Sequence, residues 1–448
     1  MLFRKISSLI EAHLKSGSRK VLLIDGARQV GKTFIIRHVC KTLFPNFIEI
    51  NMISDAEGNR LFADVTDTED FYLRLSAVAG DKMKSRDNTI VFIDEIQAYP
   101  RLLTLLKFLS QEGKFTYIAS GSLLGVTISQ TTSIPMGSIR KVRMFPLDFE
   151  EFLYANGVGT PVVEMINRKF LTREALDESM HNKIMDLFRK YLLVGGLPDA
   201  VNAYIDEKNI VPVREVQMET HEYYAADASK YDAERKLKIR RVYDLIPSNM
   251  ENKKKRVIAQ SIEGKRGKTF SDYSNEFEYL TGAGIALNVQ AISNPSFPLI
   301  ETESKNLIKL YLNDVGILTG LLYGNNIQAI LDDNRSINLG SVYETVVASE
   351  LVAHGFPLFY YDNRNRGEVD FLIDDYDALS VVPIEVKSGK DYTVHSALNS
   401  FVSNDDYRVN HAFVFSNERK VTTKGKITYM PIYFVMCFQK GTGDNLSF

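Results

Sequence analysis

Apolar residues in the first third of the chain form two unbroken runs, Val21–Ile24 and Ile90–Ile93, and a third, mostly apolar run at 115–119. Runs of this kind are typical of parallel strands that helices cover on both faces. Segments with apolar residues at helical spacing lie between the runs, among them 34–39 and 71–78. In the second segment we expect these side chains to be buried: Phe71, Leu73, Leu75 and Val78. The pattern predicts an α/β fold with a parallel sheet.

A glycine-rich turn follows the first apolar run and has the pattern G-x-x-x-x-G-K-T. Between a strand and a helix, this pattern forms a loop whose backbone N–H groups point at phosphate oxygens. We expect Lys32 to reach the β and γ phosphates of ATP and the Thr33 hydroxyl to bind Mg²⁺. The alternative is a chance match in a glycine turn. The predicted ATP-binding residues of the loop are Gly26, Ala27, Arg28, Gln29, Val30, Gly31, Lys32 and Thr33.

Polar residues follow the second and third apolar runs. Asp94 and Glu95 end the second run, where Asp94 would hold Mg²⁺ through water and Glu95 would polarise the attacking water. The alternative is a strand followed by two solvated acids. The third run ends in Ser-Gly-Ser, and we expect Ser122 or Ser120 to sense the γ phosphate, with a Ser–Gly turn of no chemical role as the alternative. The sequence therefore predicts an ATPase site with Lys32 and Glu95 as catalytic residues.

The middle of the chain changes from helical to mixed patterning. Apolar residues at helical spacing from about 160 to 230 predict a helical lid. Helical segments after that are followed by strand-like runs at 286–291 and 307–312, which we interpret as a winged-helix unit. We therefore predict four units: an ATPase core at 1–158, a helical lid at 159–238, a winged-helix-like unit at 239–330 and a further α/β domain at 331–448.

The last predicted unit carries a second group of polar residues. Glu344 lies in an amphipathic helix, Asp370 in a strand, and Glu385 and Lys387 in a later strand. A strand period of two places Glu385 and Lys387 on one face, and strand pairing can bring Asp370 beside Glu385. Glu344, Asp370 and Glu385 would bind Mg²⁺ through hard oxygen ligands, and Lys387 would orient or deprotonate a water molecule. The alternative is an ordinary Glu-x-Lys pair on a half-exposed strand.

Composition restricts the class of protein. The chain of 448 residues is 45% hydrophobic and 25% charged, which is typical of globular proteins with sizeable cores. It has no apolar run of the about 20 residues that a membrane span requires, and its first residues lack a signal-peptide pattern, so we expect a cytoplasmic protein without membrane contact. Cys40 and Cys437 have no metal-ligand spacing, and we expect two buried thiols.

Charge is unevenly distributed along the chain. The formal net charge is −2, but twelve Lys or Arg residues stand against three acids between Arg235 and Lys268. A local excess of this size favours a polyanion partner, and we expect DNA contacts there. A solvated lysine-rich face is the alternative.

The motifs together resemble a known family. The loop at 26–33, the acids at 94–95, the Ser-Gly-Ser end at 120–122 and the Phe145–Leu153 segment are similar to prokaryotic AAA+-type ATPases of the archaeal-ATPase group. The resemblance implies ATP and Mg²⁺ as cofactors, a homo-oligomer and an arginine acting on a neighbour's nucleotide. The family usually has Gly-Arg before its Pro-Leu-x-Phe segment, and this chain lacks that Gly-Arg pair. Arg140 is therefore the first candidate for the arginine that acts on a neighbour's nucleotide, and Arg143 is the second.

The C-terminal residues resemble a second group. Glu344, Asp370, Glu385 and Lys387, in this order, are similar to the core of the PD-(D/E)xK nuclease superfamily. The resemblance implies an ATPase coupled to a metal-dependent nuclease that acts on DNA. The alternative is an ATP-dependent regulatory or signalling switch whose C-terminal domain only binds a partner. The cluster of acids favours the nuclease, whereas the near-neutral overall charge favours the switch.

Overall fold

The chain folds into two compact units, described here from a computed structural model. The model describes residues 1–122, 137–227, 233–252, 255–302, 304–331, 339–389 and 392–440. Unit 1 contains residues 3–145 and 282–284, and unit 2 contains most of the remaining chain. Each unit is built around its own sheet, and each is described separately.

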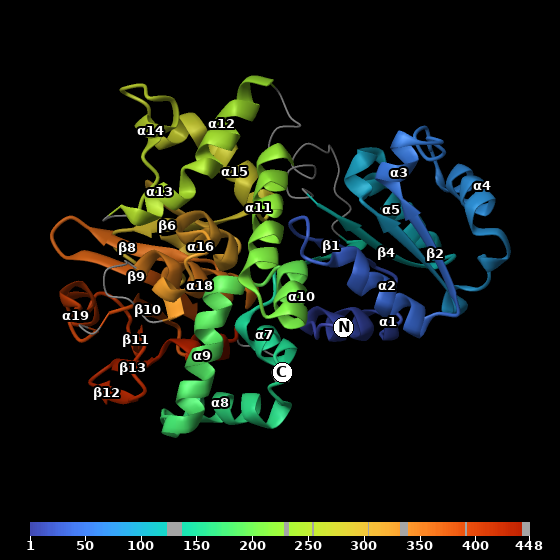
Figure 1. Cartoon of the computed structure of the whole chain (residues 1–448). Helices are drawn as coiled ribbons and strands as arrows, with labels where there is room; N and C mark the ends of the chain where they lie inside the picture. Colours follow the sequence, from blue (N-terminus) through green and yellow to red (C-terminus); the bar gives the residue numbers. More distant parts are fainter. Residues whose placement is uncertain are drawn as a thin grey trace. The chain divides into compact units, whose positions relative to one another are not determined.

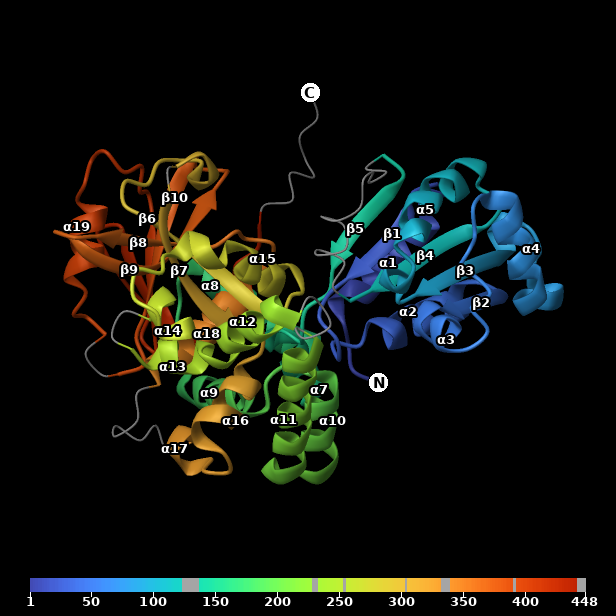
Figure 2. The same cartoon turned by 90° about the horizontal axis from the view of Figure 1, so that it is seen from above.

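Unit 1 is an α/β fold with five parallel strands in the order β2-β3-β4-β1-β5 (Figure 2). The strands are β1 (Val21–Asp25), β2 (Asn46–Asn51), β3 (Thr89–Asp94), β4 (Thr116–Gly121) and β5 (Ile139–Arg143). The helices are α1 (Lys5–Lys15), α2 (Lys32–Leu43), α3 (Met52–Glu57), α4 (Thr68–Ala79) and α5 (Pro100–Glu112). β1 and β3 are buried over their whole length, as strands with both faces covered must be. The predicted parallel sheet is confirmed for this unit.

The strand register brings the carboxyl ends of the central strands to one edge of the sheet. Asp94 at the end of β3 is paired with Asn51 of β2, and Asp25 at the end of β1 is paired with Gly121 of β4. Polar side chains that are far apart in sequence therefore meet at this edge, as in other open α/β sheets.

One burial prediction for unit 1 is partly wrong. Phe71 and Leu75 of α4 are fully buried, but the side chains of Leu73 and Val78 are 71% and 50% exposed. Leu73 is two positions from Phe71, which is about 200° around a helix, so it faces away from the core. Ala79 is the buried residue of the last turn.

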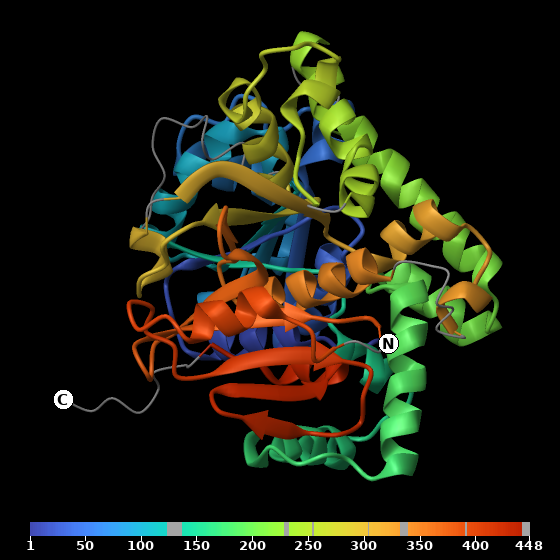
Figure 3. The ribbon, with the colours of Figure 1, turned by 90° about the vertical axis from the view of Figure 1, so that its left-hand side faces the viewer.

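Unit 2 combines helices with a mixed eight-stranded sheet of order β12-β13-β11-β10-β9-β8-β6-β7. Figure 3 shows its C-terminal strands in red. The strands are β6 (Ala286–Ile292), β7 (Ser304–Leu312), β8 (Phe359–Asn363), β9 (Gly367–Asp375), β10 (Ser380–Val386), β11 (Ala412–Ser416), β12 (Thr422–Lys424) and β13 (Ile427–Pro431). Helix α18 (Gly340–Ala353) packs on β10, β6 and β7. This contact carries residues of α18 onto the middle of the sheet.

The other helices of unit 2 come mainly from the segment before the sheet (Figure 1). They are α7 (Phe149–Ala155), α8 (Thr160–Thr172), α9 (Glu178–Val194), α10 (Pro198–Glu207), α11 (Ile210–Asp227), α12 (Ala233–Asp244), α13 (Ile246–Glu251), α14 (Ala259–Glu263), α15 (Ser274–Gly282), α16 (Val315–Tyr323), α17 (Gln328–Leu331) and α19 (Ser396–Val402). The helical pattern predicted from about 160 to 230 is present in α8 to α11.

The domain boundary predicted between residues 330 and 331 separates strands that belong to one sheet. β6 and β7 of the predicted winged-helix unit form an antiparallel pair, and β6 also pairs in parallel with β8 of the predicted last domain. Local patterning identified the two strands but could not identify this long-range partner. The two segments share one sheet and are not separate units in the structure.

Two smaller predictions can be checked directly. Cys40 and Cys437 are both free and buried, as expected. Among the described residues, no helix is long and apolar enough to cross a membrane.

The basic segment is the stretch at 235–268 that is rich in Lys and Arg. Two of its lysines, Lys253 and Lys254, lie outside the described residues.

Candidate nucleotide-binding site

The loop between β1 and α2 has the backbone shape that its glycines allow. Gly26 has φ of 155°, and a Cβ atom on it would lie 2.3 Å from the carbonyl oxygen of Met144. Gly31 is left-handed with φ of 91° and stands directly before the first residue of α2, Lys32. The Lys32 ammonium donates to the carbonyl oxygens of Gly26 and Ala27 at 3.0 and 2.7 Å. The lysine therefore lies within the curl of its own loop.

A buried arginine from the start of the chain fixes the loop from behind. Arg4 donates to the carbonyl oxygen of Val30 at 2.9 Å and to that of Phe145 at 2.6 Å. Its side chain is nearly inaccessible to solvent. Sequence reasoning missed this residue because an arginine at a helix N-terminus has no distinguishing pattern. Arg4 connects the loop to the end of unit 1.

Thr33 and Asp94 meet at the carboxyl edge of the sheet. The Thr33 hydroxyl donates to the two carboxylate oxygens of Asp94 at 3.2 and 3.1 Å. Asn51 also donates to Asp94 at 3.1 Å, and the Ser120 hydroxyl donates to its other oxygen. Burial raises the pKa of Asp94, and the hydrogen bonds from these three side chains oppose that rise. Asn51 was not predicted, although it ends β2 as Asp94 ends β3.

Glu95 is held in an uncommon backbone conformation next to Asp94. Its φ of 54° and ψ of 45° are left-handed, which is rare for a residue other than glycine and is frequent at functional sites. Its carboxylate accepts hydrogen bonds from the Ser122 hydroxyl at 3.1 Å and from the Gln97 amide, which also donates to Ser122 at 3.2 Å. Gln97 was missed because a glutamine two residues after an acid is unremarkable in sequence.

The electrostatics of the site follow from these contacts. Burial lowers the pKa of Lys32, while the carboxylates of Glu95, Asp25 and Asp94 oppose the effect. Asp25, at the end of β1, is nearly fully buried and forms ion pairs with Lys141 at 3.0 Å and Arg143 at 3.1 Å, both on β5. Arg143 therefore has a partner within its own unit. The structure thus brings Lys32, Thr33, Asp94, Glu95 and Ser122 to one edge.

The polar residues predicted in unit 2 also come together. The Lys387 ammonium lies 2.7 Å from Glu385, and the Asp370 carboxylate accepts the Val386 N–H at 2.8 Å. Burial and the neighbouring carboxylates of Glu385 and Glu344 raise the pKa of Asp370 well above its ordinary value. We call Glu344, Asp370 and Glu385 the carboxylate cluster. Glu344 and Glu385 are buried, and Asp370 is half-buried.

Lysines that sequence reasoning did not select surround this cluster. Glu344 contacts Lys255, lies 4.0 Å from Lys309 and accepts the Tyr311 hydroxyl at 2.9 Å. Burial raises the pKa of Glu344, but the two ammonium groups outweigh that effect, and the net pKa is lowered. Lys309 is fully buried and stands in an apolar strand between Ile308 and Leu310, which is a signal that could have identified it. Part of the positive charge that offsets these carboxylates therefore comes from two lysines of the same unit, Lys255 and Lys309.

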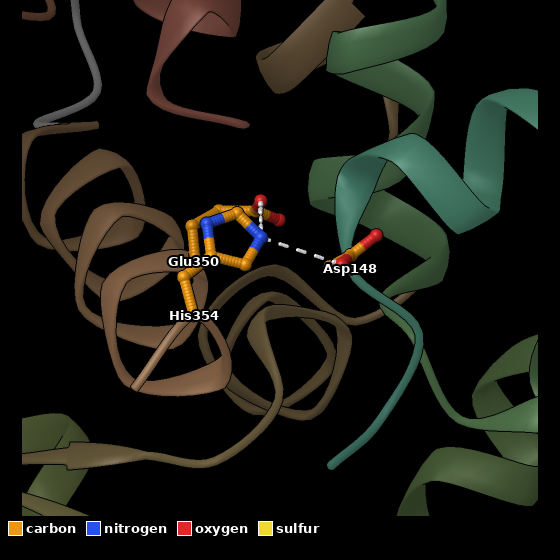
Figure 4. A group of neighbouring side chains, drawn as sticks. All are labelled: Asp148, Glu350 and His354. Atoms are coloured by element: carbon orange, nitrogen blue, oxygen red, sulfur yellow. Dashed lines mark hydrogen bonds and ion pairs between the residues drawn. The ribbon is translucent and has the colours of Figure 1, made fainter. Parts of the chain in front are cut away.

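A different trio meets the geometric condition for a metal site. The condition is that one possible ligand atom from each of at least three Asp, Glu, His or Cys side chains lies within 4.8 Å of the others. Within the described residues, the group that meets it is Asp148, Glu350 and His354 (Figure 4). The His354 Nε2 atom lies 3.4 Å from Asp148 and 3.9 Å from Glu350. Glu350 also accepts the Phe149 N–H at 2.7 Å, and Asp148 caps α7 by accepting the Glu151 N–H at 2.8 Å. The trio fixes the start of α7 to α18, and the carboxylate cluster does not meet the same distance condition.

The basic segment is largely paired with acids where it is described. Lys255 and Arg256 contact acids of the sheet and of α18. Arg240, Lys265 and Lys268 form salt bridges with nearby acids, whereas Arg241 and Arg266 are exposed. Three of the acids that pair with this segment, Asp272, Glu344 and Asp362, lie outside it and offset part of its charge, and DNA contact stays a prediction.

Comparison with known proteins agrees with the geometry of unit 1. Residues 18–153 match the model of an AAA domain. Residues 185–327 and 339–435 match two domains of unknown function, DUF8612 and DUF4143. The loop, the two acids and the parallel sheet of unit 1 agree with this match, which supports an AAA-type ATPase domain at residues 18–153. A search of curated proteins gives no match.

Similar solved structures share little sequence with this chain. The Walker-type ATPase PABY2304 of Pyrococcus abyssi is 16% identical, with a TM-score of 0.42, over 72% of this chain and 96% of that chain. The RuvB Holliday junction branch migration motor of Thermotoga maritima is 13% identical, with a TM-score of 0.29, over 64% and 89% of the two chains. Cdc6p from Pyrobaculum aerophilum is 13% identical, with a TM-score of 0.27, over 74% and 95%.

Proposed function

We propose that unit 1 binds ATP and Mg²⁺ at residues 26–33 and hydrolyses ATP. The observation that carries the proposal is the contact between the Thr33 hydroxyl and the Asp94 carboxylate, beside the ammonium group of Lys32. A hydroxyl and a carboxylate at this separation supply hard oxygen ligands, which are the ligands that Mg²⁺ prefers. The donor set therefore fits Mg²⁺, which when bound neutralises phosphate charge.

Each residue of the site has a proposed part in this reaction. The backbone N–H groups of the loop and Lys32 bind the phosphates, and Lys32 leaves the carbonyl oxygens of Gly26 and Ala27 to do so. Thr33 and Asp94 hold the cation. Glu95 takes a proton from the attacking water, and Ser122 and Gln97 orient its carboxylate.

ATP binding and turnover by the full chain test this proposal. Lys32→Ala should abolish ATP binding, because the loop loses the ammonium that reaches the phosphates. Lys20→Ala is a matched control, since Lys20 is an exposed lysine just before β1. Equal ATP turnover by wild type and Lys32→Ala would overturn the proposal.

A second candidate function belongs to the carboxylate cluster of unit 2. Four side chains lie together there: Glu344, Asp370, Glu385 and Lys387. We infer that they form a divalent-cation site that supports cleavage of DNA. The domain would then be similar to PD-(D/E)xK nucleases. Oxygen Oε2 of Glu385 is buried and has no hydrogen-bond partner among the described residues, which leaves an acceptor for a cation. A divalent cation there would activate water, while Lys387 would orient it.

Cleavage assays separate this candidate from the regulatory switch. Single- and double-stranded DNA and RNA are incubated with the protein and Mg²⁺ or Mn²⁺, with and without ATP. Cutting that is lost in both Lys387→Ala and Asp370→Ala supports a nuclease. The absence of cutting on every substrate, with ATP turnover intact, supports a switch whose C-terminal part binds a partner.

A further inference from the structure

One of the lysines beside the carboxylate cluster belongs neither to the sheet nor to α18. Lys255 lies between α13 and α14, and its ammonium contacts the Glu344 carboxylate. The next two residues fix this segment to the sheet. The Val257 N–H donates to the Ile308 carbonyl oxygen of the edge strand β7 at 3.1 Å, and Arg256 lies 3.0 Å from Asp362. We call residues 255–257 the strap.

The charges around the cluster are nearly balanced only when Lys255 is counted. The carboxylates are those of Glu344, Glu368, Asp370 and Glu385, and the ammonium groups are those of Lys255, Lys309 and Lys387. Lys309 is part of β7, and Lys387 directly follows β10. The backbone positions of these two lysines are therefore fixed by the sheet. Lys255 is the one of the three that a movement of the strap alone would remove.

Two further observations concern the strap and the cluster. Lys255 has φ of 47°, a left-handed conformation that is strained for a lysine and favours glycine. Glu385 is almost fully buried, and its Oε1 atom is paired with Lys387, but its Oε2 atom has no hydrogen-bond partner in the part of the chain that the structure describes. The lysine is thus held in a strained position beside a cluster that still has an unused acceptor.

We propose that Lys255 is an internal competitor of a divalent cation at the carboxylate cluster. Its ammonium occupies Glu344, so a cation must displace it to use that carboxylate. Displacement of the strap from β7 raises the affinity for the cation, and its return lowers the affinity. The proposal rests on the cation site of the second candidate function and adds the residue that sets its affinity.

Mn²⁺ binding to the nucleotide-free full chain, followed by electron paramagnetic resonance of the free ion, tests the proposal. The Mn²⁺ that Glu385→Gln loses is the ion bound at the cluster. Lys255→Met should bind this Mn²⁺ at least about tenfold more tightly than wild type, which corresponds to about 1.4 kcal/mol. Lys255→Gly should behave in the same way, because glycine accepts the left-handed backbone and removes the ammonium.

Two matched variants should not change the affinity for Mn²⁺. Lys255→Arg keeps the positive charge, and Lys265→Met removes an exposed lysine whose salt-bridge partner is Glu263 and not the cluster. Wild-type affinity in both Lys255→Met and Lys255→Gly, with binding still lost in Glu385→Gln, would overturn the role of Lys255 and leave the cation site. If no variant shows Mn²⁺ binding that depends on Glu385, both the cation site and the competition are overturned.

Discussion

The Thr33 hydroxyl lies 3.1 Å from the Asp94 carboxylate, although 61 residues separate them in sequence. The two side chains meet because β1 and β3 end at the same edge of a parallel sheet, with β4 between them. The same edge holds Lys32 and Glu95. This arrangement places the proposed cation ligands, the proposed phosphate-binding lysine and the proposed base within one small region.

Gln97 and Ser122 are predicted to act through Glu95. Gln97→Ala and Ser122→Ala each remove a donor that holds the Glu95 carboxylate, so the base should lose its orientation. We expect kcat for ATP hydrolysis to fall by about 10- to 100-fold while the Kd for ATP changes little, because both side chains contact Glu95 and the proposed phosphate ligands are Lys32 and the N–H groups of the loop. Steady-state kinetics and equilibrium ATP binding measure the two quantities.

The conservative variant Ser122→Thr, which keeps the hydroxyl, is the control for this prediction. A parallel loss of ATP affinity and kcat in Ser122→Ala would instead indicate direct contact with the γ phosphate, as in the sensor role predicted from sequence.

Arg4 is predicted to stabilise the phosphate-binding loop. Arg4→Ala leaves the buried carbonyl oxygen of Val30 and the partly buried one of Phe145 without their charged donor, so the free energy of unfolding should fall by about 2 to 3 kcal/mol. ATP affinity should also fall, because the loop is less well ordered. Thermal unfolding and ATP titration measure these effects.

Lys15→Ala on the same helix is the matched control, because its salt bridge with Glu11 is exposed. Exposed pairs contribute at most about 1 kcal/mol. Equal effects of the two substitutions would contradict a special role for Arg4.

Asp370→Asn is predicted to increase stability and to abolish any cleavage. The half-buried Asp370 carboxylate lies beside Glu385 and Glu344, and desolvation and these two carboxylates raise its pKa, so neutralising it removes an unfavourable charge. Asparagine can still accept the Val386 N–H. We expect a gain of about 1 kcal/mol in denaturant unfolding without divalent cations. A loss of stability would show that the carboxylate has a structural role.

Asp314 should make stability depend on pH. Its buried carboxylate caps α16 by accepting the Ile317 N–H and also accepts the Gly196 N–H, and burial raises its pKa to about 6. A carboxyl group with a higher pKa in the folded chain stabilises the fold below its unfolded pKa of about 4. That contribution is lost as the pH rises through about 6.

Thermal unfolding of wild type and Asp314→Asn between pH 4 and pH 7 tests this expectation. The advantage of wild type in Tm should shrink as the pH increases, because asparagine does not titrate. A constant difference across this range would contradict the raised pKa.

Much of unit 1 follows from local sequence. The apolar runs of β1 and β3 identify buried parallel strands, and the glycines of the loop have the backbone angles that the motif requires. The orienting partners Asn51, Gln97 and Arg4 could not be identified in the same way. Their roles depend on which strands are neighbours and on side-chain contacts over long sequence distances, which local patterns do not contain.

Unit 2 shows the same limit more strongly. The order Glu344, Asp370, Glu385 and Lys387 predicted residues that lie together, but the compensating Lys255 and Lys309 were missed. The sequence predicts strands at 286–291 and 307–312, yet their membership of the C-terminal sheet depends on the pairing of β6 with β8. A winged-helix unit was the simpler local interpretation.

The nucleotide bound to Glu95→Gln after incubation with ATP and Mg²⁺ tests the central claim most directly. The variant removes the base but keeps the loop, Lys32, Thr33 and Asp94. The account predicts that the variant retains ATP, with turnover reduced by about 100-fold or more, whereas wild type releases ADP and phosphate. Release of ADP by Glu95→Gln at the wild-type rate would contradict it.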